Sequence, residues 1–369
     1  MRTRLIRCLT AVVSLVPLTL PAQTPARPPL APVLRIGGVE GDDHTLFNRI
    51  SGVVRLANGD VAVANQGSNE IRWFSGNGQW LRTTGRDGAG PGEYRGLGRL
   101  LLLQGDSVLA EDMLTARMTL YDGKGKLVRS WTIAPAGAYV TPPPLGRLAD
   151  GSFVATASRS LTPPPGHIHF LTVLIRYVGG AIADTLATAP GGEGFSVPCG
   201  NGACNLGVPY GVRAMAAVAR GVVYVGNGER YELLRIDPRT KRIDTLRRNV
   251  PAVPLDAARR AYYLDSLTSN LPAGRRAEVR ERLKATPARR AMPFFDALLA
   301  DDRGQLWLAR PQRRDAAVRS WDLLDGDGRF LRSVDLPSGL NVMQVAGGHV
   351  VGVRRDADGV ESVEVYRVP

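Results

Sequence analysis

The sequence predicts an all-β protein, a six-bladed β-propeller, and three observations carry this prediction. The 369 residues include 42 glycines and 26 prolines, which is typical of a chain with many tight turns. Two strand-and-turn patterns alternate six times along the chain. The last repeat also lacks an outer strand, which the segment before the first repeat is able to supply.

The first pattern is a glycine-containing turn followed by an apolar strand. Its first three glycines are 46 residues apart, and the later ones follow at intervals of 70, 83 and 44 residues. A repeat of about forty residues with four short strands is typical of a propeller blade. The six turn glycines are Gly59, Gly105, Gly151, Gly221, Gly304 and Gly348.

The second pattern is an apolar or aromatic strand, a Gly- or Asp-rich turn and a further strand. It occupies residues 71–83, 118–131, 173–186, 233–246 and 319–334, and a last copy at 363–369 stops before its turn. A single unit of this kind cannot bury both faces and exposes two strand edges. Six units packed in a ring bury those faces against one another, which is why the repeat predicts a propeller.

The two ends of the chain are expected to close the ring. The sixth unit has three strands, and residues 32–36 supply a fourth, outermost strand. We therefore predict a single domain over residues 23–369, with an N-terminal strand in the last blade. A pair of β-sandwiches is the competing architecture, but sandwiches do not repeat in this way.

The first 22 residues have the pattern of a secretory signal peptide. Arg2, Arg4 and Arg7 precede an apolar run over residues 9–20, and Ala22 supplies a small residue for cleavage. The run is shorter than the roughly 20 apolar residues that span a bilayer, and no later stretch is long enough. We predict an exported protein, periplasmic or extracellular, without a membrane span.

The chain is basic, with a formal net charge of +13. Removal of the signal peptide with its three arginines leaves +10, and only four of the 47 basic residues are lysines. A positive field of this kind attracts nucleic acids and anionic membranes. No Lys/Arg block is interleaved with stacking aromatics, however, so we expect no nucleic-acid partner. We also expect a monomer.

Residues 84–94, with the sequence TGRDGAGPGEY, resemble the loop that joins successive blades in exported bacterial propellers of the NHL-repeat type. The matching positions are Gly85, Arg86, Gly88, Gly90, Pro91, Gly92, Glu93 and Tyr94. The resemblance covers nearly the whole mature chain, although the later units lack the Gly-Pro-Gly-Glu run. It implies the six-bladed fold and no single activity, because such propellers serve as lyases, lactonases and binding scaffolds.

The long insertions are expected on one face of the disc. With the strands of each unit lettered A to D from the centre outward, the A–B and C–D turns are short and share one face, the turn face. The opposite, loop-rich face carries the B–C loops and D–A connections, which include residues 84–97, 158–166, 188–211 and 251–295. Long loops on a rigid scaffold usually carry the binding site, so we predict the site on the loop-rich face.

The largest insertion, residues 251–295 between units four and five, has a helical pattern. The acidic start at Asp256 and the spacing of Tyr263, Leu264 and Leu267 predict one helix, which the Leu-Pro-Ala-Gly sequence at 271–274 ends. Residues 275–284 predict a second helix. The helical pair either packs on the edge of one blade or covers the channel mouth as a lid.

A ring of side chains is expected where the B strands end, six residues after each turn glycine. Its polar members are candidates for binding a polar or anionic ligand, with the two arginines as bidentate donors. Strand ends near water are commonly polar, which is the structural alternative. The ring comprises Asn65, Glu111, Ala157, Asn227, Arg310 and Arg354.

Arg86 and Glu93 of the resembling loop are further binding candidates. The glycine amides around them could form a nest for an anion, or the glycines could simply permit a tight turn. Lactonase-like propellers hold a calcium ion through Glu, Asn and Asp side chains, and Asn65, Glu93, Glu111 and Asn227 are the acceptors available here. No such set matches residue by residue, so we expect no cofactor, with calcium as the alternative.

Cys199 and Cys204 are the two cysteines of the mature chain and predict a local disulfide in an oxidising compartment. A metal clip is the alternative, but no neighbouring histidine supplies the further ligands. His167 and His169 fall on one side of a predicted strand and offer two metal ligands as a weaker alternative. We expect no carboxylate or cysteine of that unit to complete the set.

The sequence contains no GxSxG, HExxH, P-loop or EF-hand motif. We therefore predict an exported, non-catalytic binding or scaffold protein that recognises a protein partner or a polar, saccharide-like ligand on its loop-rich face. The alternative is a metal-assisted lyase or lactonase-like enzyme with a cation in the central channel.

Overall fold

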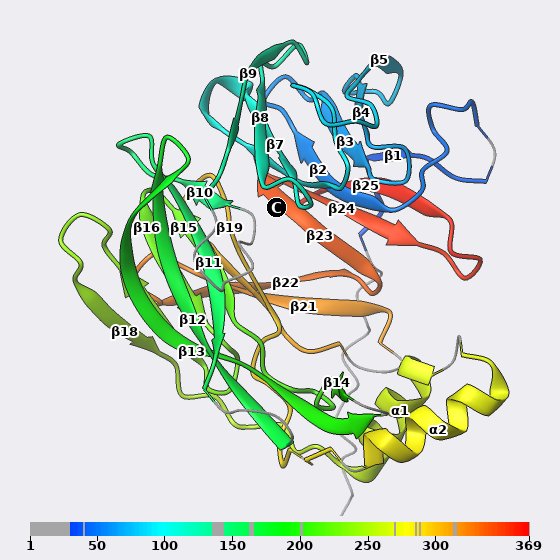
Figure 1. Ribbon diagram of the computed structural model, residues 1–369, viewed down its shortest axis with the longest axis vertical. Coiled ribbons are helices and arrows are strands. Elements are labelled where there is room, and N and C mark those ends of the chain that lie inside the picture. The colour runs from blue at the N-terminus through cyan, green and yellow to red at the C-terminus, as the bar shows by residue number, and fades with distance from the viewer. Residues whose placement is uncertain are drawn as a thin grey trace, which may run out of the picture.

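The computed structural model describes residues 30–39, 41–134, 144–161, 166–199, 202–268, 271–284, 286–287, 289–312 and 316–368. Within these residues the chain forms six antiparallel sheets, arranged as the blades of a propeller (Figure 1). The predicted all-β, six-bladed fold is confirmed, and two α-helices accompany it. The predicted signal peptide falls on residues before Leu30 and lies outside the described part of the chain.

Blades 1, 2, 4 and 5 each consist of four strands that pair in the order of the sequence. Blade 1 contains β2 (Ile50–Arg55), β3 (Val61–Asn65), β4 (Glu70–Phe74) and β5 (Trp80–Thr84). Blade 2 contains β6 (Leu97–Leu102), the 3-10 turn η1 (Gln104–Asp106), β7 (Val108–Asp112), β8 (Arg117–Tyr121) and β9 (Leu127–Thr132). Blade 4 contains β15 (Met215–Ala219), β16 (Val222–Gly226), β17 (Glu232–Ile236) and β18 (Ile243–Arg247). Blade 5 contains β19 (Ala297–Ala300), β20 (Leu306–Ala309), β21 (Val318–Leu324) and β22 (Phe330–Pro337).

Blade 3 has five strands and the longest hairpin of the molecule. Its strands are β10 (Pro144–Arg147), β11 (Phe153–Ser160), β12 (Gly166–Val178), β13 (Ala181–Cys199) and β14 (Gly202–Leu206). The prediction of a connection over residues 188–211 is wrong in part, because β13 continues to Cys199 and β14 follows it. The glycines of this segment suggest a loop, but Gly191 lies within a strand. A Cβ at this position would lie 2.5 Å from the Phe170 carbonyl oxygen, so glycine permits the two backbones to approach closely here.

The sixth blade combines both ends of the chain. It contains β23 (Leu340–Ala346), β24 (His349–Arg355), β25 (Glu361–Arg367) and, as its outermost strand, β1 (Leu34–Ile36). Leu34 pairs with Val365, and Arg35 forms an ion pair with the buried carboxylate of Glu364. The N-terminal strand thus occupies the place in the last sheet that residues 32–36 were expected to take.

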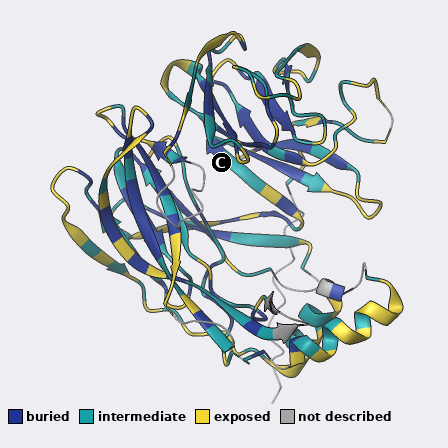
Figure 2. Ribbon diagram, viewed as in Figure 1, coloured by how far each residue is buried: buried dark blue, intermediate teal, exposed yellow. Residues whose placement is uncertain are grey.

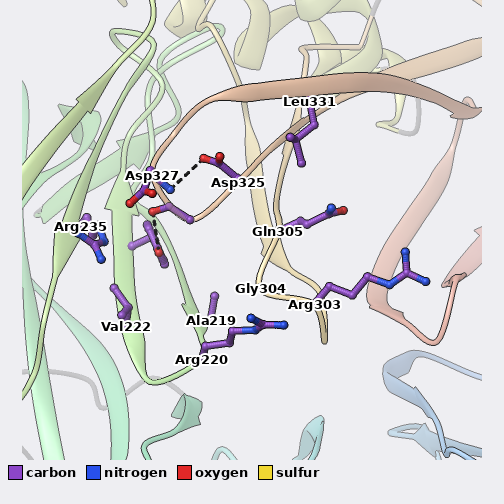
Figure 3. Close-up of a pocket in the computed structure, with 12 residues that line it drawn as sticks. Ala219, Arg220, Val222, Arg235, Arg303, Gly304, Gln305, Asp325, Asp327 and Leu331 are labelled. Carbon is purple, nitrogen blue, oxygen red and sulfur yellow. Dashed lines mark hydrogen bonds between the residues drawn. The ribbon is translucent and has the colours of Figure 1, made fainter.

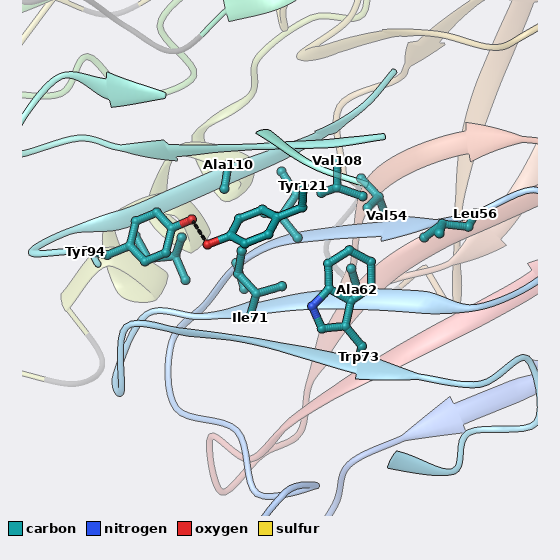
Figure 4. Packing of buried hydrophobic residues seen from close by; sticks show 12 residues of the cluster. Val54, Leu56, Ala62, Ile71, Trp73, Tyr94, Val108, Ala110 and Tyr121 are labelled. Carbon is teal, nitrogen blue, oxygen red and sulfur yellow. Dashed lines mark hydrogen bonds between the residues drawn. The ribbon is translucent and has the colours of Figure 1, made fainter. Parts of the chain in front are cut away.

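Six apolar clusters fill the six interfaces between neighbouring blades. Between blades 1 and 2, Trp73, Tyr94 and Tyr121 are buried, and the two tyrosine hydroxyls form a hydrogen bond of 2.8 Å (Figure 4). Another cluster joins blade 6 to blade 1 and includes Ile36 and Val351. Buried residues follow the inner strands, while outer strands such as β9 are largely exposed (Figure 2). Packing between blades is therefore the main source of apolar burial, which stabilises folds by about 25 cal/mol per Å².

One turn glycine shows how closely the blades approach. Gly125, between β8 and β9 of blade 2, has a φ of 73°. A Cβ at this position would lie 2.9 Å from Cε2 of Trp73 in blade 1. Both the backbone conformation and the available space therefore require glycine in this turn.

The insertion between β18 and β19 contains α1 (Ala257–Thr268) and α2 (Ala273–Lys284), where two helices were predicted. Asp256 caps α1, because its Oδ1 accepts a hydrogen bond of 2.8 Å from the Arg259 amide. The ends of the insertion form a paired stem, in which the Leu255 amide donates to the Arg290 carbonyl oxygen at 3.0 Å. No helix in the described residues is long and apolar enough to cross a membrane.

Candidate functional site

The two asparagines of the predicted ring organise loops around them. Asn65 is buried; its Oδ1 accepts a hydrogen bond of 2.7 Å from the Asn48 amide, and its Nδ2 donates to Ser68 Oγ at 2.8 Å. Asn227 Nδ2 donates to the carbonyl oxygen of Gly191 at 3.0 Å, which ties blade 4 to β13 of blade 3. Both amide groups therefore have structural partners within the fold.

The two arginines of the ring lie against buried carboxylates. Arg310 Nη2 and Nε lie 2.7 and 3.2 Å from the two carboxylate oxygens of Asp322, and Arg354 Nη1 lies 3.8 Å from Glu364 Oε2. Burial alone would raise the pKa of Asp322, but hydrogen bonds from Arg310 and from two hydroxyl groups hold it below its ordinary value. Arg310 thus neutralises a buried anion of its own blade.

Glu111 differs from the other ring members, because it lacks a full set of partners. It is 5% exposed, and its Oε2 accepts no hydrogen bond from the described residues. It faces a bulge in β6, where a Cβ on Gly98 would lie 2.7 Å from this oxygen. Burial raises the pKa of Glu111 to about 7, although the amide and the charge of Arg99 oppose the shift. Near neutral pH this carboxyl is therefore only partly ionised.

The ring is a set of separately anchored groups rather than one assembled site. Ala157 is buried within β11, and no hydrogen bond or ion pair in the described part of the chain joins two ring positions. A role of these residues in ligand binding stays a prediction.

Arg86 and Glu93 hold the loop between blades 1 and 2 in its shape. Arg86 Nε and Nη2 lie 2.8 and 2.6 Å from Glu93 Oε1, and the Gly90 amide donates to Glu93 Oε2 at 2.7 Å. The Gly90 amide, and after it Arg86, lowers the pKa of Glu93. Because the carboxylate already occupies an amide of the glycine loop, this geometry favours a tight turn; ligand binding by the two residues stays a prediction.

A cluster of polar side chains lies on the projecting part of blade 3. There β12 and β13 have 13 and 19 residues, more than any strand of the other blades. The imidazole rings of His167 and His169 are 4.3 Å apart, and His169 pairs in register with Glu193 of β13. His167 Nε2 lies 2.8 Å from Glu193 Oε2. Glu193 belongs to the extended part of β13, where the sequence predicted a connection, and metal binding by the two histidines stays a prediction.

The helical insertion adds Arg289 to this cluster. Arg289 Nη1 lies 2.5 Å from Glu193 Oε1, and its Nη2 lies 3.8 Å from Glu229 Oε1 of blade 4. Burial alone would raise the pKa of Glu193, but the Val212 amide, Arg289 and His167 together hold it below its ordinary value. Glu193 is thus a buried anion that fastens the insertion to blade 3. We call His167, His169, Glu193 and Arg289 the projecting cluster.

Aromatic packing provides a second attachment of the insertion. The rings of Tyr210 and Tyr263 are 5.0 Å apart, and Tyr210 Oη donates to the carbonyl oxygen of Arg259 at 3.3 Å. These contacts join α1 to the segment between β14 and β15. The helices consequently lie beside the end of blade 3 where β14 is found (Figure 1).

The insertion also concentrates positive charge on this side of the molecule. Residues 251–295 contain nine basic and four acidic residues, a net charge of +5. The four acidic residues form ion pairs with Arg259, Arg280, Arg282 and Lys284. Arg275 and Arg290 are exposed and form no ion pair with another described residue. Two of the five surplus cations are therefore presented to solvent, while Arg289 is paired with Glu193 of blade 3.

The projecting cluster suits an anionic or hydrogen-bonding ligand better than a metal ion. The described residues contain no group of three His, Cys, Asp or Glu side chains placed to hold a metal. Among the described residues, the carboxylate found at the histidines is Glu193, which is already paired with Arg289, and that guanidinium would repel a cation. The imidazoles and the arginine instead provide donors for oxygen atoms.

The predicted disulfide cannot be followed to its sulfur atoms, since the side chains of Cys199 and Cys204 lie outside the described residues. The backbone places Cys199 opposite Gly202 and Cys204 opposite Val197 across β13 and β14. The disulfide stays a prediction.

Comparisons with known proteins support the fold. The chain is similar to a protein of Bacteroides fragilis that is named for its expected export, with a TM-score of 0.51, 12% identity, and coverage of 92% of this chain and 95% of that one. A DUF4221 family member from Bacteroides vulgatus gives a TM-score of 0.52 at 10% identity, with coverage of 91% and 97%. Virginiamycin B lyase from Staphylococcus aureus gives 0.42 at 10% identity, with coverage of 88% and 97%.

No protein-family model and no curated protein matches the sequence. At these identities the two likenesses with TM-scores above 0.5 support the fold that the six sheets show, and they leave the activity open. The similarity to NHL-type propellers accordingly stays a resemblance.

Proposed function

We propose that the protein is an exported, non-catalytic binding protein that takes a polar, anionic, saccharide-like ligand on its loop-rich face. The projecting cluster and the positively charged helical insertion form the proposed binding surface. One observation carries the proposal: the Glu193–Arg289 pair, 2.5 Å apart and almost fully buried on the glutamate side, fixes the insertion beside the two histidines. The signal pattern in residues 1–22 supports export.

The surface offers donors of the kind that carboxylated sugars require. His169, Arg275 and Arg290 are exposed. Guanidinium groups bind carboxylates through paired, charge-assisted hydrogen bonds, and imidazoles donate to hydroxyl and carboxyl oxygens. The Arg289–Glu193 ion pair and the contact between Tyr263 and Tyr210 hold the insertion in place, which removes part of the ordering cost of binding.

Isothermal titration of the mature chain with oligogalacturonate, an anionic oligosaccharide, tests this proposal. We expect saturable binding that weakens about tenfold in the double variant Arg275→Gln/Arg290→Gln, because two charge-assisted contacts are lost. The control Arg239→Gln/Arg329→Gln removes the same charge from exposed positions on the turn face and should leave binding unchanged. Equal losses in both variants, or no binding, would contradict the proposal.

A metal-assisted lyase or lactonase is the second candidate, and the pair His167–His169 beside Glu193 is the observation in its favour. Thermal unfolding with calcium, zinc and chelator separates the two candidates. An ion that binds only the folded state must raise the melting temperature. We expect no such response, because Arg289 already occupies the carboxylate.

A further inference from the structure

A pocket lies on the turn face, across the boundary between blades 4 and 5 (Figure 3). Its volume is about 460 Å³, which is within the range of small-molecule sites. Ala219, Val222 and Leu331 give it an apolar part, while its polar wall contains three arginines, Arg220, Arg235 and Arg303, among other residues. We propose that this pocket binds a small oxyanion, a carboxylate or phosphate group, through Arg220 and Arg303.

The two arginines occupy equivalent positions in neighbouring blades. Arg220 and Arg303 each precede the turn glycine between strands A and B, in blades 4 and 5. The residue before this glycine in the other blades is Asn58, Gln104, Asp150 or Gly347. The ring geometry therefore brings two cationic side chains together at the boundary between blades 4 and 5, and no other two neighbouring A–B turns carry cations at this position.

The conformation of Arg220 indicates that its side chain serves a purpose other than making the turn. Arg220 and Gly221 have φ angles of 48° and 79°, the two positive values of a type I′ turn. Such turns favour Asn or Gly at the first position, and an arginine there is strained. A Cβ on Gly304 would lie 2.9 Å from Arg220 Cδ, so the arginine extends over this glycine, next to Arg303.

Both guanidinium groups are available to a ligand. Arg220 and Arg303 are exposed, and neither forms an ion pair with another described residue. Arg235 adds a third guanidinium group to the lining of the pocket. Its Nη1 lies 3.3 Å from Asp244 Oδ2, and its buried Nε has no partner in the described chain. Three guanidinium groups around one pocket strongly favour a negatively charged occupant.

The acidic lining limits the ligand to a small one. Asp325 Oδ1 accepts hydrogen bonds from the amides of Asp327 and Arg329, so this carboxylate is engaged by its own turn (Figure 3). The carboxylate of Asp327 is exposed on the same wall. The carboxylate of Asp327 would repel a ligand with several negative charges. A ligand with a single oxyanion avoids this repulsion: the oxyanion binds the arginines, and a hydroxyl or amino group of the same ligand lies near Asp327.

Isothermal titration of the mature chain at low chloride, with inorganic phosphate and with succinate as separate probes, tests the site. We expect one probe to bind saturably, and the comparison decides between a phosphate and a carboxylate. Arg220→Asn should weaken binding about tenfold while keeping the turn, because asparagine suits its first position. Arg303→Gln should have an effect of similar size.

The matched control is Arg239→Gln, since Arg239 is 90% exposed on the same face but outside the pocket. Its binding should equal that of the unmodified chain. Binding of neither probe, or equal losses in the control and in Arg220→Asn, would overturn the proposal. Arg275→Gln/Arg290→Gln should retain the anion binding, so the outcome is independent of the site proposed on the loop-rich face.

Discussion

The buried carboxylates of this protein differ in whether an arginine is paired with them. Asp322 and Glu193 are paired with Arg310 and Arg289, respectively, and both have a lowered pKa. Glu111 has an unpartnered oxygen and a pKa raised to about 7. The first two are therefore anions near neutral pH and hold parts of the fold together, whereas Glu111 titrates in that range.

The pKa of Glu111 makes stability depend on pH. Its ordinary value of 4.5 applies to the unfolded chain, so between pH 4.5 and about 7 the folded state binds more protons and the free energy of unfolding falls as pH rises. We expect Glu111→Gln to be more stable than the unmodified chain above this range, by roughly 3 kcal/mol, and similar to it below the range. Urea unfolding across pH measures this difference. Parallel profiles for the two proteins would contradict the assignment, and Glu278→Gln, at an exposed ion pair, serves as the control.

Replacing the ring arginines separates a structural role from a binding role. Arg310→Ala would leave the buried Asp322 without its bidentate partner, and we expect a loss of about 1–3 kcal/mol in the free energy of unfolding. Arg354 is more distant from its carboxylate, which Arg35 also contacts, so Arg354→Ala should cost less than about 1 kcal/mol. Chemical denaturation compares the two. If Arg310→Ala does not change the stability, the pairing with Asp322 is not needed for the fold. The guanidinium of Arg310 in the unmodified chain would then be available to a ligand.

At the scale of elements, the helical insertion between β18 and β19 is attached to the propeller but does not contribute to the apolar interfaces between its blades. None of the six interface clusters includes a described residue from 256–288. The stem that pairs Leu255 with Arg290 also brings the ends of the insertion together. The fold and the proposed binding surface are therefore separable by mutation.

Replacing residues 256–288 with a short Gly-Ser linker tests this separation. We expect the melting temperature to change by only a few degrees, because the interface clusters remain complete. Affinity for oligogalacturonate should fall severalfold, since Arg275 and the other cations of α1 and α2 are lost while Arg290 of the stem remains. Calorimetry and titration measure the two effects. Global unfolding of the shortened chain would show that the insertion supports the ring.

The elements that sequence analysis predicted are those encoded locally. Turn glycines such as Gly59 and Gly151 repeat with the blades and mark their A–B turns. Asp256 is an N-cap residue and predicts the start of the first helix. The extension of β13 was missed because Pro190–Gly194 has the composition of a loop, while the role of Gly191 depends on its contact with Phe170. The pairing of Glu193 with Arg289 joins residues 96 positions apart and has no signal in the local sequence.

At the scale of the molecule, ring closure explains how one rigid disc carries two different faces. The apolar clusters run through all six interfaces, and the pairing of Leu34 with Val365 joins the chain ends. Short turns on one face and insertions on the other then follow from the strand order. The insertion, with a net charge of +5, and the turn-face arginines lie on opposite sides, so the two sites proposed above would not compete for one ligand.

Hydrogen–deuterium exchange of the mature chain, with and without oligogalacturonate, is the most direct test of the claim that the loop-rich face binds the ligand. The account predicts protection in the projecting ends of β12 and β13, in α1 and α2, and around Arg289, with unchanged exchange in the turns at Arg220 and Arg303. Protection confined to the turn face, or spread evenly over both faces, would contradict it.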